Sequence, residues 1–433
     1  MQPIGRNPHK LRILKNIVQS EYFQQVFTLS SGTSFAHLIT VLSYFVLTQI
    51  YSPANIGDFS FFHSAIVILS ILATATFEFA IVLPENRERG IGLLAVAVIN
   101  TGIVTILLTL LAALLYPYLT ALLNIKVGLL FFIIPGTFLV GIFNSLTYWY
   151  VRNNQYGELS KGKIVQSSTT AVAQIGSGIL NWLSYGMIGG YVIGRTIANI
   201  YLFLRASFYN TRKILSGRYL IALAKKYSDQ PKFIVFSRLL SQGALEVPVF
   251  LIAILFNNEL LGYYGLAYRV LSVPSSFIGT SVGHVFYKHI SLKYNKNSPI
   301  TPFLLKTWGG LFITGLIPMV LLIFWGQELF QLVFGQTWGA AGKIATIMAP
   351  VLLIKFVTAP TEKAMLVFGQ QRMVPLFSGI DFTGRVAGLY IGYLQSAFFW
   401  GVAYMVGFQL IAIFLLNTYI LFLSKKNDNQ EYR

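Results

Sequence analysis

Long apolar runs recur along the whole chain and are separated by short polar segments. A run of about 17–25 apolar residues is the length that an α-helix needs to cross the hydrocarbon core of a bilayer. The pattern therefore predicts an all-α integral membrane protein with about 12 transmembrane helices and no soluble domain on either face. The predicted spans are 26–50, 57–83, 91–115, 128–151, 164–184, 187–205, 233–256, 263–287, 302–326, 341–367, 374–396 and 397–423.

The two halves of the chain resemble each other. The segment IGDFSFFHSAIVILSILATATFEFAIV at 56–82 aligns with LGYYGLAYRVLSVPSSFIGTSVGHVFY at 261–287, so that Gly57 falls on Gly262 with an offset of 205 residues. Six spans followed by six form a parallel repeat, which many transporters use to build a substrate path between two lobes. We expect an N-terminal six-helix lobe at 1–205, a basic cytoplasmic linker at 206–232 and a C-terminal six-helix lobe at 233–433.

Composition supports a membrane location. Hydrophobic residues make up 55% of the chain and charged residues 11%, whereas a soluble domain carries about a quarter charged residues. The net charge of +18 resides mainly in alternate connections, especially the linker, and this asymmetry predicts that both termini are cytoplasmic. Lys126 and Lys343 are the exceptions. Because the basic residues follow this topology pattern, we expect no nucleic-acid partner.

Five of the basic residues inside predicted spans suggest a function, because a charge within a span is costly. Arginine binds phosphate through paired hydrogen bonds, so a cation-lined path is suited to an anionic substrate. We predict a cationic, substrate-binding cavity formed by these five residues: Arg195, Arg238, Arg269, Lys355 and Arg385. Three polar residues of the predicted spans are also expected to line it, namely Gln174, Gln242 and Ser276.

Four of the acidic residues inside predicted spans are candidates for coupling or gating: Glu78, Glu246, Glu362 and Asp381. A structural ion pair is the alternative for each of them. It is strongest for Asp381 and Arg385, whose spacing of four residues suits direct pairing on a helix. The chain shows no catalytic motif and no metal-binding motif. A proton or a sodium ion is the expected coupling ion, and the sequence favours neither.

Two blocks of the chain resemble a known family. They are YSPANIGDFSFFHSAIVILSILATATFEFAIVLPENRE at 51–88 and LLGYYGLAYRVLSVPSSFIGTSVGHVFY at 260–287. With the length and the number of spans, they are similar to the Wzx-type polysaccharide flippases of the multidrug/oligosaccharidyl-lipid/polysaccharide (MOP) exporter superfamily. This resemblance implies alternating-access transfer of undecaprenyl-pyrophosphate oligosaccharides from the cytoplasmic to the periplasmic leaflet of a bacterial inner membrane. It also implies that the two lobes form a V. The protein would then act in O-antigen, capsule or exopolysaccharide synthesis, alongside polymerase and chain-length proteins.

Two other functions compete with this interpretation. An ion-coupled multidrug exporter of the same superfamily would need an acidic cavity for cationic drugs, yet the cations within the spans are at least as numerous as the acids. A membrane polymerase or glycosyltransferase would need large extracytoplasmic loops, and the predicted loops are short. We therefore expect a transporter and not an enzyme.

Overall fold

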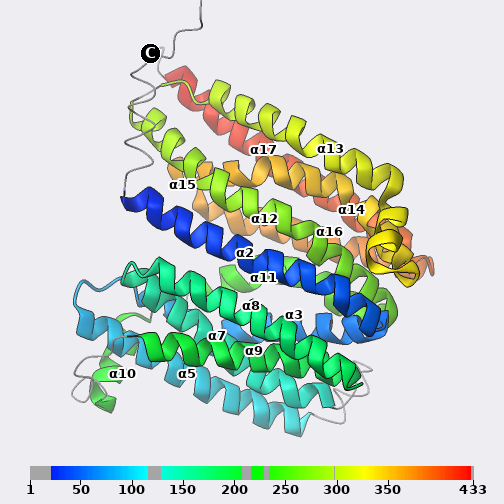
Figure 1. Ribbon diagram of the computed structural model, residues 1–433. Coiled ribbons are helices and arrows are strands. Elements are labelled where there is room, and N and C mark those ends of the chain that lie inside the picture. Colours follow the sequence, from blue (N-terminus) through cyan, green and yellow to red (C-terminus); the bar gives the residue numbers. More distant parts are fainter. Residues whose placement is uncertain (1–20, 116–127, 207–215, 229–233, 297, 431–433) are drawn as a thin grey trace, which may run out of the picture.

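The computed structural model describes residues 21–115, 128–206, 216–228, 234–296 and 298–430. Long helices lie side by side in two groups, which we call the first and second lobes (Figure 1). The first lobe consists of α2 (Glu21–Ile50), α3 (Pro53–Thr74), α4 (Phe77–Ala80), α5 (Arg87–Leu114), α7 (Gly128–Arg152), α8 (Tyr156–Ile179) and α9 (Leu183–Arg205). Helix α10 (Gly217–Lys226) belongs to the linker. The second lobe consists of α11 (Val235–Leu255), α12 (Asn258–Asn295), α13 (Thr301–Phe334), α14 (Gly339–Thr358), α15 (Ala364–Val367), α16 (Val374–Leu394) and α17 (Phe398–Gln430).

Each predicted span coincides with a long helix in the described part of the chain. Nine of the helical segments are apolar enough to cross a membrane by length and composition. The remaining long helices are α8, α12 and α16, and each of them contributes a basic residue to the internal cavities described below: Lys163, Arg269 and Arg385. Several helices extend beyond the predicted spans. Helix α8 begins at Tyr156, before the predicted start at 164, and α12 continues to Asn295, past the predicted end at 287. The apolar run marks the hydrocarbon core, and a helix can continue into the headgroup region beyond it.

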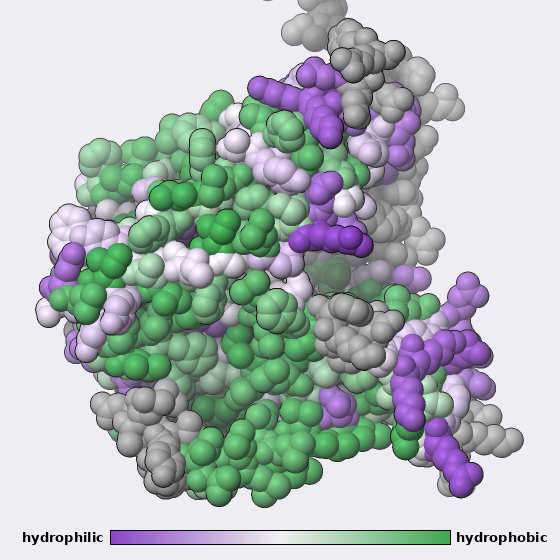
Figure 2. All heavy atoms as spheres, turned by 180° about the vertical axis from the view of Figure 1, so that it is seen from behind, coloured by the Kyte–Doolittle hydropathy of each residue, from purple (hydrophilic) through white to green (hydrophobic). Residues whose placement is uncertain are grey.

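The surface between the two ends of the bundle is apolar. Leu110, Ile313 and Leu332 are 62%, 70% and 83% exposed, and many other large apolar side chains lie on this surface. Figure 2 shows this hydrophobic surface, with hydrophilic residues gathered at the end of the molecule that carries α10. An apolar surface of this extent is stable only in contact with lipid. The protein is therefore a multi-pass membrane protein.

The second span is broken near one end. Helix α3 ends at Thr74, and Ala75 and Thr76 follow with left-handed φ angles of 45° and 57°, before α4 begins at Phe77. Such angles are strained for residues with a side chain. Asn100 Nδ2 donates a 2.9 Å hydrogen bond to the carbonyl of Ala73, which the break leaves without its helical partner. The break places Glu78 on a short separate helix.

The lobes pack together through α3 against α12 and α11. At the closest approach Gly57 of α3 lies against the backbone of Asn258, and Gly262 of α12 lies against the backbone of Pro53. In both cases a Cβ atom would clash with a carbonyl oxygen. The offset of 205 residues relates both pairs, because 53 + 205 = 258 and 57 + 205 = 262. The contact therefore has the symmetry expected of the repeat, while the domain boundaries at 205 and 233 stay a prediction.

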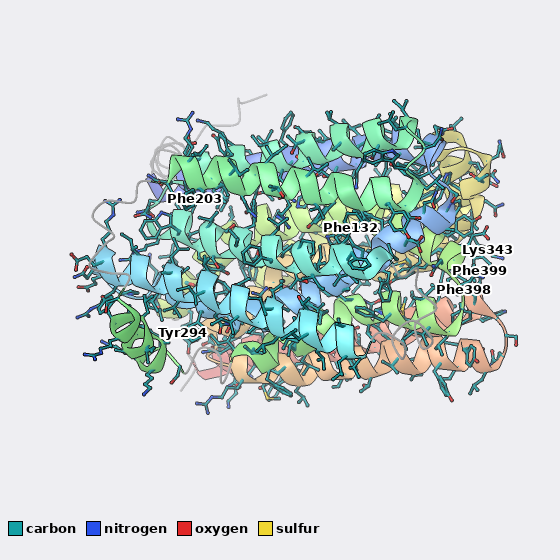
Figure 3. All side chains as sticks on the ribbon, turned by 90° about the horizontal axis from the view of Figure 1, so that it is seen from below. Phe132, Phe203, Tyr294, Lys343, Phe398 and Phe399 are labelled. Atoms are coloured by element: carbon teal, nitrogen blue, oxygen red, sulfur yellow. The ribbon has the colours of Figure 1, made fainter. Side chains whose placement is uncertain are left out.

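Lys343 was an exception to the charge asymmetry, and its contacts offer a local reason. Its ammonium lies 4.3 Å from the centroid of the Phe399 ring. Figure 3 shows Lys343, Phe398 and Phe399 together at one end of the bundle, with Phe203 and Tyr294 toward the other. A cation above an aromatic face is stabilised electrostatically. Lys126, the other exception, lies outside the described residues.

Candidate functional site

The first lobe encloses a cavity of about 320 Å³, which we call the first-lobe cavity. Its walls come from α2, α3, α7, α8 and α9, and one side chain reaches it from α12 of the second lobe. Three basic residues line it: Lys163, Arg195 and Arg269. Two histidines, His37 and His63, also line it, and none of its described lining residues is Asp or Glu. The lining is therefore cationic without an internal counter-charge.

Arg195 is held on α9 by neutral groups. Its guanidinium donates to Gln166 Oε1 at 2.8 Å and to the Tyr191 hydroxyl at 2.9 Å. It also lies over the ring of Phe143, 4.4 Å from the centroid. Its buried Nε has no hydrogen-bond partner among the described residues. These contacts fix the orientation of the guanidinium and leave its positive charge uncompensated by any acid.

Arg269 enters the same cavity from the other lobe. Its Nη1 donates a 2.5 Å hydrogen bond to the hydroxyl of Tyr44 on α2. Its guanidinium lies 4.5 Å from the ring centroid of Phe59 on α3. Both partners belong to the first lobe, so Arg269 links the two lobes at the cavity. The charge of the cavity therefore depends on how the lobes are placed relative to each other.

Lys163 is a cavity residue that the sequence pattern missed. The predicted fifth span begins at 164, which leaves Lys163 in the preceding cytoplasmic connection. The helix begins eight residues earlier, at Tyr156, so Lys163 lies within α8 and its Nζ donates to Thr33 Oγ1 at 3.0 Å. The helical spacing of Lys163 with Gln166 and Thr170 is the signal that identifies it, since residues three, four and seven apart share a face.

The second lobe holds a separate cavity of about 410 Å³, which we call the second-lobe cavity. Two cations and two acids line it: Lys355, Arg385, Glu362 and Asp381. Arg385 Nη2 lies 2.9 Å from Asp381 Oδ2, in the direct pair that their spacing suggested. With its amide oxygen turned toward the cations, Gln409 accepts from Lys355 Nζ at 2.7 Å and from Arg385. Opposite charges balance in this cavity, unlike in the first.

Arg238 lines neither cavity. Its Nη1 lies 3.6 Å from Glu78 Oε1, and its guanidinium lies over the ring of Phe79, 5.0 Å from the centroid. The pair joins α11 of the second lobe to α4 of the first. The five predicted cations therefore do not meet in one cavity: Arg195 and Arg269 share one, Lys355 and Arg385 share another, and Arg238 is held by an acid.

The remaining predicted residues make specific contacts. Glu246 accepts from Ser64 Oγ at 2.6 Å across the lobes and from Gln242 Nε2 at 2.8 Å within α11. Gln174 lines the first-lobe cavity, but its Nε2 donates to the carbonyl of Met187 at 2.8 Å. Ser276 lies on α12 in a stretch whose side chains are outside the described residues. Gln242 is therefore a hydrogen-bond donor to Glu246, and Gln174 joins α8 to α9 through its hydrogen bond to Met187.

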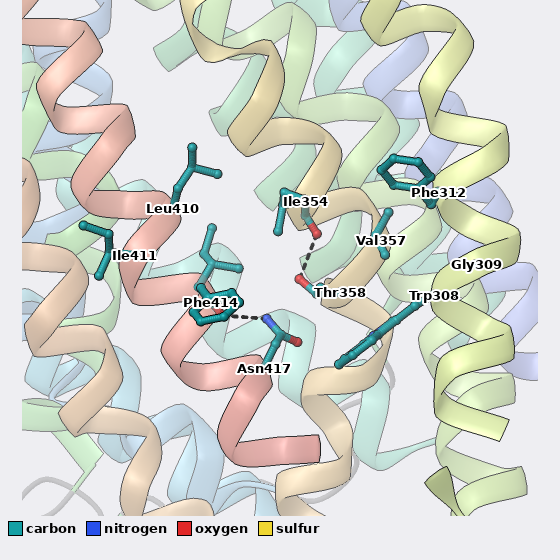
Figure 4. A pocket seen from close by; sticks show the side chains of 11 residues that line it. Trp308, Gly309, Phe312, Ile354, Val357, Thr358, Leu410, Ile411, Phe414 and Asn417 are labelled. Carbon is teal, nitrogen blue, oxygen red and sulfur yellow. Dashed lines mark hydrogen bonds between the residues drawn. The ribbon is translucent and has the colours of Figure 1, made fainter. Parts of the chain in front are cut away.

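An apolar groove of about 710 Å³ lies on the second lobe between α13, α14 and α17 (Figure 4). Two of its polar side chains satisfy carbonyls of their own helices. Thr358 donates to Ile354 at 2.9 Å, and Asn417 donates to Ile413 at 2.8 Å. The groove offers no charged group, so the two internal cavities and not this groove are suited to bind an anion.

The fold of two helical lobes is shared with solved transporters of the MOP superfamily. The fold matches the lipid II flippase MurJ in its inward closed conformation, with a TM-score of 0.73 and 13% identity, over 92% of this chain and 89% of that chain. It also matches an inward-facing multidrug resistance transporter of the MATE family of that superfamily, with a TM-score of 0.66 and 11% identity, over 92% of this chain and 99% of that one. At such identity the likeness concerns the fold.

The family follows from the sequence. Residues 22–290 match the model of the family described as "Polysaccharide biosynthesis protein", and this protein belongs to that family. A curated relative is the teichuronic acid biosynthesis protein TuaB of Bacillus subtilis (strain 168), 25% identical over 138 residues. That match covers 32% of this chain and 29% of TuaB, so it spans less than a third of either protein. The resemblance to polysaccharide flippases of the MOP superfamily is confirmed by these comparisons.

Proposed function

We propose that this protein is a flippase that moves undecaprenyl-pyrophosphate-linked oligosaccharides from the cytoplasmic to the periplasmic leaflet. The observation that carries the proposal is the first-lobe cavity, in which Lys163, Arg195 and Arg269 have only neutral partners among the described lining residues. Buried charges without a counter-charge are costly. A pyrophosphate group would supply the missing negative charge, and arginine is well suited to bind it.

The surroundings of these cations suit a glycolipid. Tyr44, Tyr191 and Gln166 place hydroxyl and amide groups in the cavity, which can bind sugar hydroxyls. The polyprenyl chain would remain in the bilayer beside the apolar outer surface of the bundle. Family membership supports a role in polysaccharide synthesis, and the relative TuaB is named for teichuronic acid biosynthesis.

Arg269 suggests how binding and conformational change are linked. It belongs to the second lobe, while its hydrogen-bond partner Tyr44 belongs to the first. A ligand that requires Arg269 and Arg195 together binds more tightly when the lobes approach at the cavity, and a ligand shifts an equilibrium only through such differential affinity. Alternating access would then move the bound pyrophosphate between the two faces of the membrane.

Coupling is proposed at the acidic residues between and within the lobes. Glu78 and Glu246 make contacts across the lobes, and Glu362 and Asp381 lie in the second-lobe cavity. Binding of H⁺ or Na⁺ at one of them would change the charge between transport states. We place the protein in the bacterial inner membrane with both termini cytoplasmic, working beside polymerase and chain-length proteins of the same pathway, without enzymatic activity of its own.

A multidrug exporter of cationic compounds is disfavoured by the same cavity. Basic residues with no acid among the described lining residues repel a cationic drug. The acids of the second-lobe cavity are already balanced by Lys355 and Arg385. The two functions differ in the charge of the substrate. A binding assay with a pyrophosphate lipid and a cationic dye therefore separates them.

The decisive experiment reconstitutes the purified protein in vesicles with a labelled polyprenyl-pyrophosphate oligosaccharide. Protein-dependent transfer of the label to the opposite leaflet, inhibited by inorganic pyrophosphate, is the expected result. Deletion of the gene in its host should trap lipid-linked repeat units on the cytoplasmic leaflet. Absence of transfer by a protein that binds no pyrophosphate lipid would overturn the proposal.

A further inference from the structure

Helix α10 lies in the linker at the hydrophilic end of the bundle. Figures 1 and 3 show that it is a short helix set beside the first lobe and crossing the direction of the long helices. It contacts α5 near the end where α5 begins at Arg87. A helix in this orientation, at the level where the apolar surface of the bundle ends, lies parallel to the plane of the membrane interface.

The two faces of α10 differ in character. Leu220 and Leu223 are buried in an apolar cluster of the first lobe. The opposite face exposes Arg218, Ile221 and Lys225. Their spacing of three and four residues places them on one side of the helix. Ile221 is 59% exposed between the two cations, which is unfavourable for a large apolar side chain in water.

The cations of this face have no acidic partner within the described part of the chain. Arg218 and Lys225 form no salt bridge there, and α10 itself contains no acidic residue. Lys226 flanks them, with its ammonium 5.9 Å from the centroid of the Tyr227 ring. An apolar residue flanked by unpaired cations is the pattern of an amphipathic helix that lies in a membrane interface.

We propose that α10 docks on anionic lipid headgroups of the leaflet at this end of the bundle. Arg218 and Lys225 bind lipid phosphates, and Ile221 enters the boundary between headgroups and acyl chains. The exposed Ile221 favours a lipid surface over an acidic protein partner, because hydrocarbon lies beside the helix already. Since Leu220 and Leu223 anchor α10 to the first lobe, lipid binding would hold that lobe and the linker at the interface.

The test uses the absence of cysteine from the chain. A single cysteine is introduced as Ala222→Cys, on the exposed face, and labelled with a fluorophore that responds to polarity. The protein is reconstituted in vesicles of phosphatidylcholine alone or with phosphatidylglycerol. Emission should shift to the blue only with phosphatidylglycerol, and salt should reverse the shift because it screens exposed charges.

A charge-reversal variant and a matched control decide the cause. Arg218→Glu with Lys225→Glu should abolish the shift, while Arg218→Gln with Lys225→Gln should weaken docking by about fivefold per cation. Lys425→Glu with Lys426→Glu on α17 makes the same charge change away from α10 and should leave the shift intact. Equal emission in both lipids would overturn the proposal, as would equal loss in the control. Crosslinking of the labelled site to an acidic protein in cells, independent of anionic lipid, would also overturn the proposal.

Discussion

Glu78 and Arg238 connect the two lobes by an ion pair, with Arg238 Nη1 3.6 Å from Glu78 Oε1. The carboxylate is buried, with 1% of its side chain exposed, whereas the arginine side chain is 37% exposed. One oxygen of the carboxylate has no hydrogen-bond partner among the described residues. The pair lies beside the helix break after Thr74, and its rupture would remove a contact between α4 and the start of α11.

The first prediction concerns this pair. Glu78→Gln and Arg238→Gln should each destabilise the protein, and the double variant should show a coupling energy of about 1 kcal/mol, since water partly screens the exposed arginine. Thermal unfolding in detergent measures it through a double-mutant cycle. The exposed pair Lys161–Glu158 is the control and should show a smaller coupling. Additive effects of the two substitutions would mean that the contact does not hold the lobes together.

The second prediction separates the arginines by cavity. Arg195→Ala and Arg269→Ala should each weaken binding of a polyprenyl-pyrophosphate lipid by about ten- to a hundredfold, because a charge-assisted hydrogen bond contributes roughly 1.5–3 kcal/mol. Arg238→Ala should leave this affinity unchanged, since Arg238 lies outside the cavity. Lysine at 195 or 269 should restore binding only in part, because an ammonium lacks the paired donors of arginine. Equal losses in all three alanine variants would contradict the assignment.

The third prediction concerns coupling. Glu246→Gln retains a side chain of the same shape that can accept from Ser64, but it removes the charge. We expect normal binding of the lipid and loss of net transport in vesicles with an imposed ion gradient. Glu362→Gln is tested in parallel, because Glu362 lies in the second-lobe cavity. Full gradient-driven transport by both variants would exclude these two carboxylates as the coupling groups.

The fourth prediction concerns membrane orientation. Lys225→Cys lies on α10 and Gln395→Cys lies in the turn between α16 and α17, both at exposed positions. An impermeant thiol reagent added to intact cells should label position 395 and should label position 225 only after lysis. The natural chain contributes no background because it contains no cysteine. The reverse labelling pattern would invert the topology and move the basic linker to the outside.

The fifth prediction concerns the glycines between the lobes. Gly57→Val and Gly262→Val should each destabilise the packed state by about 1–3 kcal/mol or more, because the added atoms collide with backbone carbonyls of the other lobe. Gly176→Ala on α8 is the control, since a Cβ there meets nothing within 4 Å. Thermal unfolding and membrane levels report the effect. Wild-type stability in both valine variants would show that the lobes do not approach as closely as described.

The positions of the helices could be predicted from the sequence because the thickness of the bilayer imposes one length on every span. The ends of the helices could not be predicted in this way, since a helix can continue past the hydrocarbon core through polar residues such as Glu158 and Lys161. Their salt bridge, 2.7 Å long, lies in the first turns of α8 and lowers the pKa of the Glu158 carboxyl, chiefly through the hydrogen bond from Lys161. Lys163 was misplaced for this reason.

Which charged residues contact each other could not be predicted from the sequence. Helical periodicity places Arg238, Gln242 and Glu246 in one stripe of α11, and the structure confirms that Gln242 and Glu246 bind each other. The partner of Arg238 is Glu78, which lies 160 residues earlier in the chain (238 − 78 = 160). Glu78 follows a helix break that no local sequence pattern predicts. Contacts between distant spans depend on tertiary packing, and a single sequence does not record them.

The reciprocal contact of Gly57 and Gly262 has a consequence for how the molecule originated. In a two-fold symmetric homodimer, residue i of one subunit touches residue j of its partner, and j touches i in return. Here Gly57 meets Asn258 while Gly262 meets Pro53, so one polypeptide reproduces the interface of a symmetric pair. A six-helix ancestor that paired with its own copy through this glycine would have had the same contact before duplication fused the two copies. One polypeptide thus retains the contact geometry of a symmetric pair.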